Sequence, residues 1–149
     1  MVYQNKSHKK GFSLLEVLIV IGIFAIVASI STASYYNYKS HTNLELATNG
    51  LVEAIRFAQA SAESGKFDSK WGVKVFADKV LVFKGDSYDS RDLDFEQSLS
   101  FSGNMSNGGL SEIVFEKLNG ETSMTGTMTL TNEYGSKNIN INEKGTVTY

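Results

Sequence analysis

A single carboxylate interrupts the most apolar stretch of the chain. Residues 12–33 read FSLLEVLIVIGIFAIVASISTA and carry one charged residue, Glu16. A carboxylate in a membrane segment costs on the order of 2.5–3.5 kcal/mol at the bilayer centre and less near its edge. Glu16 is therefore either a side chain that reaches the nearby polar interface or a group with a function of its own.

The apolar stretch has the length and the flanks of a membrane-spanning helix. As a helix it would extend about 33 Å, close to the thickness of a hydrocarbon core. Basic residues precede it and tyrosines follow it, at positions Lys6, Lys9, Lys10, Tyr35, Tyr36 and Tyr38. Since basic flanks stay in the cytoplasm, we expect a single-pass membrane protein, N-terminus in and C-terminus out.

Two other interpretations of the stretch stay open at this point. A secretory signal peptide has an apolar core of roughly 7–15 residues followed by a small-residue cleavage site. Ala28-Ser29-Ile30 and Ser31-Thr32-Ala33 could mimic such a site, but the apolar run is longer than such a core. A plain signal anchor has the right length but gives no reason for an acid at Glu16.

The residues around the start of the stretch resemble the processing motif of type IV prepilins. The resemblance rests on Lys9-Lys10-Gly11-Phe12-Ser13-Leu14-Leu15-Glu16 and the apolar run that follows. It implies that a prepilin peptidase cleaves between Gly11 and Phe12, that Phe12 is then N-methylated, and that Glu16 is the glutamate found at the fifth mature position in this family. It also implies a location in the bacterial inner membrane. The implied partners are the peptidase, other pilin or pseudopilin subunits and an assembly platform in the inner membrane.

Each part of the motif also has a physical rationale. Gly11 lets a protease approach the backbone closely. An apolar segment that survives cleavage can anchor the subunit first and pack in a filament core later. There, Glu16 could neutralise the Phe12 amine of a neighbouring subunit, because a buried acid is tolerated when it is paired. Glu16 is thus the candidate residue for assembly and register.

The rest of the chain predicts an α+β fold with an antiparallel sheet. Apolar residues at steps of three and four continue the helix, at Leu44, Ala47, Leu51, Ile55, Ala58 and Ala62. The chain has no proline, so we expect one helix over 13–64, ending at Gly65. A hairpin over 71–83 and further strands over 98–102, 111–118, 123–131, 138–142 and 146–149 would pack on its second half.

The expected organisation has four parts. Residues 1–11 form a cytoplasmic leader that is cleaved, and 12–34 form the membrane or filament-core half of the helix. Residues 35–64 form its amphipathic half, and 65–149 a β-rich head. The head resembles minor pilins and pseudopilins around the type II secretion H subunit, through Trp71-Gly72-Val73-Lys74-Val75 and Lys84-Gly85-Asp86-Ser87-Tyr88-Asp89. This resemblance implies a subunit of a type IV pilus, competence or type II secretion filament.

Composition disfavours other functions. Without the three lysines of residues 1–11, 11 basic residues face 16 acidic ones, a formal charge of about −5, which is unsuited to phosphate binding. DNA uptake stays the alternative, although the C-terminal stretch Lys144–Tyr149 has one lysine and no arginine. With no cysteine and two histidines, His8 and His41, we expect no enzyme and no cofactor.

An acidic stretch, GDSYDSRDLDFE over 85–96, is expected to be a loop. Its carboxylates, among them Asp86, Asp89 and Asp92, could hold calcium, and some major pseudopilins bind calcium in a loop. The spacing does not match an EF-hand, and a solvated loop with Arg91 inside is the simpler interpretation. We therefore predict no metal site and keep these three aspartates as calcium candidates.

Overall fold

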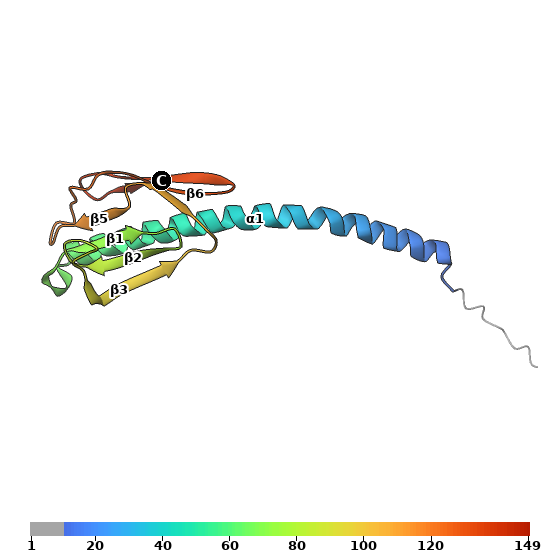
Figure 1. The fold of residues 1–149 in the computed structure, drawn as a ribbon, viewed down its shortest axis with the longest axis horizontal. Coiled ribbons are helices and arrows are strands. Elements are labelled where there is room, and N and C mark those ends of the chain that lie inside the picture. Colours follow the sequence, from blue (N-terminus) through green and yellow to red (C-terminus); the bar gives the residue numbers. More distant parts are fainter. Residues whose placement is uncertain (1–10) are drawn as a thin grey trace, which may run out of the picture. The chain divides into compact units, whose positions relative to one another are not determined.

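The computed structural model describes residues 11–149; at 30–37, 39 and 40 it describes the backbone alone. The chain divides into two compact units, Met1–Tyr36 and Asn37–Tyr149. One helix, α1 (Leu14–Glu63), contributes to both (Figure 1). The expected uninterrupted helix over 13–64 is thus confirmed to within one residue at each end.

The second half of α1 buries the predicted apolar stripe. Leu51, Ile55 and Ala58 have no exposed surface, and Leu44, Ala47 and Ala62 are also buried. The helix stops at Gly65, whose left-handed φ of 62° suits glycine. Two backbone N–H groups, those of Gly65 and Leu118, donate to the Ala62 carbonyl at 3.0 and 2.9 Å and so satisfy the helix end.

Residues 71–148 form two antiparallel sheets, which confirms the α+β fold. The first has the strand order β3 (Asp92–Ser100), β2 (Lys79–Lys84), β1 (Trp71–Val75), β5 (Glu112–Phe115). The second has the order β4 (Ser106–Gly109), β6 (Gly126–Asn132), β7 (Gly135–Ile141), β8 (Val147–Thr148). A 3-10 turn, η1 (Lys66–Asp68), joins α1 to β1.

One core joins the helix to both sheets. Alternate residues of the strands point toward α1 and meet its buried stripe, so side chains from three elements share one apolar layer. Burial of each such side chain contributes about 1.5–3 kcal/mol. The completely buried members include Leu51, Ile55, Val73, Ile113, Phe115, Leu130 and Ile139.

Strand positions within the head follow the predictions unevenly. The hairpin is confirmed, with Val75 paired to Val80 across the turn. The acidic stretch is a loop only as far as Arg91, because β3 begins at Asp92; that part of the loop prediction is wrong. The strand expected over 111–118 ends at Phe115, since the Gly120 N–H donates to the Glu116 carbonyl at 3.0 Å and closes a turn.

Strand β4 is absent from the sequence-based prediction. Asn107-Gly108-Gly109 is typical of a tight turn, yet these residues pair with Leu130, Thr129 and Met128 of β6. Gly109 is required there because a Cβ atom would come within 2.2 Å of a backbone oxygen of β6. Tertiary pairing therefore overrides the local turn preference.

Candidate functional site in the N-terminal apolar segment

The described part of the unit Met1–Tyr36 begins with a capped helix. The Glu16 N–H donates to the Ser13 side-chain oxygen at 3.2 Å and to the Ser13 carbonyl at 3.1 Å. Ser13 and Glu16 have the spacing of a capping box, and an acid in the first turn favours the positive end of the helix dipole. The cap on Ser13 was missed, although the pattern Ser-x-x-Glu could have revealed it.

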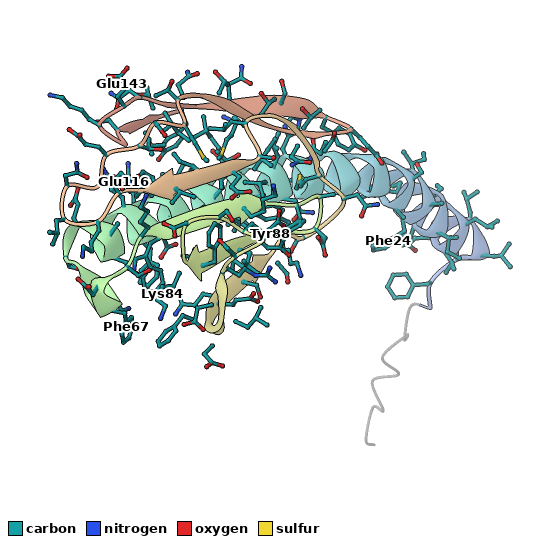
Figure 2. The ribbon with its side chains drawn as sticks, turned by 60° about the vertical axis from the view of Figure 1, so that its left-hand side comes forward. Phe24, Phe67, Lys84, Tyr88, Glu116 and Glu143 are labelled. Atoms are coloured by element: carbon teal, nitrogen blue, oxygen red, sulfur yellow. The ribbon has the colours of Figure 1, made fainter. Side chains whose placement is uncertain are left out.

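The helix that follows exposes apolar side chains in all directions. Phe12 and Leu14 are 82% and 81% exposed, and large aliphatic and aromatic side chains remain exposed along the helix as far as Val27. Phe24, 71% exposed, projects from the ribbon in Figure 2. A contiguous apolar surface of this size marks a segment that requires cover by lipid or protein.

Glu16 lies in a shallow hollow on this surface. The hollow has a volume of about 270 Å³ and is lined by Phe12, Glu16, Val17, Val20 and Ile21. These residues recur at steps of one, three and four, so they share one side of the helix. Glu16 is the only lining residue with a polar side chain. Glu16 is thus the one charged residue beside an apolar hollow, which suits a partner that brings an amine and apolar groups together.

Gly11 precedes the helix and is exposed. A Cβ atom at Gly11 would meet nothing within 4 Å among the described atoms. The described atoms therefore set no steric demand for glycine at this position. The basic residues Lys6, Lys9 and Lys10, with His8, lie outside the described residues.

Among the residues that the structure describes, no helix is both long enough and apolar enough to span a membrane.

Comparison with known proteins identifies the segment. Residues 6–32 match the family described as the prokaryotic N-terminal methylation motif. This match covers the N-terminal segment alone, the part of the chain that resembles type IV prepilins. The motif supports a pilin-like or pseudopilin subunit, processed by a prepilin peptidase and assembled with other pilin subunits. No curated protein and no solved structure matches the chain significantly.

Two of the calcium candidates, Asp86 and Asp92, lie beside lysine side chains. Asp92 pairs with the Lys84 ammonium at 2.7 Å, and this hydrogen bond holds the pKa of Asp92 below its usual value. Asp86 lies 3.6 Å from the ammonium of Lys70. Within residues 11–149, no three carboxylate or imidazole groups are placed to hold a metal ion. The calcium hypothesis gains no support.

The loop that contains these acids instead covers one face of the first sheet. Tyr88 packs edge-on against Phe76 and Phe83, with ring centroids 5.4 and 6.1 Å away. The Arg91 guanidinium lies 3.9 Å from the centre of the Tyr88 ring, donates to the Tyr88 carbonyl at 2.8 Å and pairs with Glu96. Arg91 and Tyr88 thus give this stretch a packing role; Tyr88 is labelled in Figure 2.

Two further candidates lie on the surface of the unit Asn37–Tyr149. His41 is exposed on α1, with its ring centroid 5.9 Å from that of Tyr134. Lys144 is exposed, and its backbone carbonyl accepts a hydrogen bond from Gln59 at 2.9 Å. DNA binding through the Lys144–Tyr149 stretch stays a prediction that these contacts do not test.

Proposed function

We propose that this chain is a structural subunit, a minor pilin or pseudopilin, of an extracytoplasmic filament in a type IV pilus, competence or type II secretion system. The supporting observation is that Glu16 is the one charged residue beside the hollow, on an exposed apolar helix surface that carries the methylation motif. A surface of this kind suits assembly rather than catalysis, and we propose no enzymatic activity.

Processing would create the group that Glu16 pairs with. Cleavage between Gly11 and Phe12 leaves a new amine one residue before the Ser13 cap, and methylation of Phe12 keeps its positive charge. The Phe12 ring and its amine are adjacent, so they can enter the apolar hollow of a neighbour together. Pairing the amine with Glu16 removes the cost of an unpaired buried charge and selects one axial register between helices.

The same segment would serve as the membrane anchor before assembly. We propose that residues 12–34 span the inner membrane with the basic residues on the cytoplasmic side, as the charge asymmetry predicts. An assembly platform in that membrane would then extract the subunit into the filament. The exposed apolar side chains from Phe12 to Val27 support this proposal because they are unfavourable in water.

The test compares Glu16→Ala and Glu16→Gln with the matched control Glu45→Ala, an exposed acid on the same helix. Mass spectrometry of the N-terminus reports cleavage after Gly11, and immunoblots of sheared filaments report incorporation. We expect all three variants to be cleaved, and both Glu16 variants to lose at least nine-tenths of their incorporation while Glu45→Ala keeps it. Normal incorporation of Glu16→Gln would show that the carboxylate charge is not needed.

A further inference from the structure

A groove of about 440 Å³ lies between α1 and the β3 edge of the first sheet, within the unit Asn37–Tyr149. On the helix its residues are spaced by three, one and three, so they share one face. Apolar side chains form most of the lining. We call it the β3 groove; it is lined by Gly50, Glu53, Ala54, Phe57, Val80, Val82, Gln97, Ser98 and Leu99.

The strand beside the groove has an open backbone edge. β3 is the outermost strand of its sheet and pairs with β2 alone. The Phe101 N–H donates to the Asp78 carbonyl at 2.7 Å, in the same register that places Ser98 opposite Leu81. In an antiparallel ladder the pattern alternates, so Ser98 and Ser100 turn their N–H and C=O groups away from β2. An edge of this kind can accept a further strand.

Exposed leucines accompany this edge. Leu93 is 69% exposed and Leu99 is 48% exposed, both on β3. Leu99 also packs directly on the helix, where a Cβ atom at Gly50 would lie 2.5 Å from its Cδ2 atom. An added strand could place alternate side chains over Leu99 and the helix floor at Ala54, while its backbone continues the sheet.

Charge decides which kind of strand fits. Asp92 and Glu96 are neutralised within the chain by Lys84 and Arg91. Asp94 on β3 and Glu53 in the groove are exposed, and neither has an ion-pair partner among the described residues. The strand itself contains no basic residue. Pairing β3 with β3 of a second copy would set like charges beside each other, which is unfavourable.

We propose that the β3 edge receives an extended segment of a different pilin-like subunit, with apolar residues at alternate positions and lysine or arginine between them. The segment adds a strand to β3, sets its apolar side chains in the β3 groove and directs its cations to Asp94 and Glu53. This inference rests on the proposed function, because it names the type of neighbour that the subunit contacts in the filament.

Peptide binding to the full-length chain in detergent micelles tests the proposal. The probes are two fluorescent nine-residue peptides with valine at every second position: one carries lysines between the valines, and the other carries glutamates at the same positions. By fluorescence anisotropy we expect the lysine peptide to bind at least tenfold more tightly than the glutamate peptide. Equal affinity, or equal binding to empty micelles, overturns the proposal.

Variants separate the backbone, apolar and charge contributions. Ser98→Pro removes an outward N–H that makes no bond to β2, so it should abolish binding and leave Trp71 fluorescence unchanged. Leu99→Gln should weaken binding at least tenfold, whereas the control Leu46→Gln, at a position 61% exposed on α1, should not. If Ser98→Pro unfolds, Asp94→Lys combined with Glu53→Lys decides instead, because it should reverse the preference between the two peptides. Retained preference overturns the proposal.

A cysteine placed on the edge tests the alternative occupant. The chain has no cysteine, so Ser98→Cys provides a single thiol. A disulfide-linked homodimer of Ser98→Cys in membranes would assign the edge to a second copy and overturn the proposal; its absence alongside peptide binding supports it. A chain that enters filaments but binds neither peptide refutes this inference alone, whereas one that binds the lysine peptide but never enters filaments refutes the proposed function.

Discussion

Gln59 ties the C-terminal half of α1 to two loops that are distant in sequence. Its side-chain Nε2 donates to the Lys144 carbonyl at 2.9 Å and to the Gly120 carbonyl at 3.3 Å. A hydrogen bond of this type contributes about 0.5–1.5 kcal/mol net. The Lys144 bond is exposed, so water can replace it, but the Gly120 bond is partly buried. Gln59→Ala should therefore lower the free energy of unfolding by about 1–2 kcal/mol.

The natural reporter for this measurement is Trp71, the one tryptophan in the chain, which is 3% exposed. Urea unfolding of the full-length protein in detergent micelles, followed by Trp71 fluorescence, measures the change. The control is Glu45→Ala on the exposed side of the same helix, which should change stability by less than about 0.5 kcal/mol. Gln59→Glu keeps the length of the side chain but replaces the donating amide with a carboxylate, which faces both carbonyl acceptors with another acceptor.

We expect Gln59→Glu to lose at least as much stability as Gln59→Ala near neutral pH, because an ionised carboxylate cannot donate. If Gln59→Ala is no less stable than the Glu45→Ala control, water satisfies both carbonyls and the predicted loss of unfolding free energy is wrong. If Gln59→Glu is as stable as the wild-type protein, the amide of Gln59 is not the donor that holds the two loops.

Three further outcomes follow from single contacts. Leu51→Ala, at a fully buried core position, should cost about 2–5 kcal/mol in the same urea experiment. Gly145→Ala should cost more than about 1 kcal/mol, because φ is 71° and a Cβ atom would lie 2.8 Å from a backbone oxygen; an unchanged midpoint would refute this strain. The bond from Lys84 lowers the folded pKa of Asp92, so its stabilisation is present above the unfolded value and disappears as pH falls through the folded value. Asp92→Asn should therefore show a smaller drop in melting temperature on acidification than the wild type, and an identical drop would contradict the ion pair.

Local patterns predicted the helix well. The uninterrupted helix follows from the absence of proline and the period of its apolar residues, and its end follows from Gly65. Residues 6–32 are a contiguous motif, so Gly11, Phe12 and Glu16 could be named without knowing what surrounds them. Their roles in cleavage, methylation and register stay predictions.

The sheets were harder to predict because strand pairing is a long-range property. Gly108 and Gly109 favour a turn by themselves, and only β6 makes them a strand. Likewise, the acids after Gly85 resemble a solvated loop until Lys84 and Arg91 pair with Asp92 and Glu96. At these positions, pairing with residues elsewhere in the chain determines the structure and overrides the local conformational preference.

The sequence by itself determined the features of the long helix α1. These are its length, its apolar first half, the apolar stripe of its second half, its end at Gly65 and the carboxylate of Glu16. These depend on residues within a few turns of one another, so spacing is sufficient to reveal them. Only the tertiary structure decided the β3 edge, its groove against α1 and the two loops held by Gln59. These features join residues separated by tens of positions, and nothing in the local sequence records which segments meet.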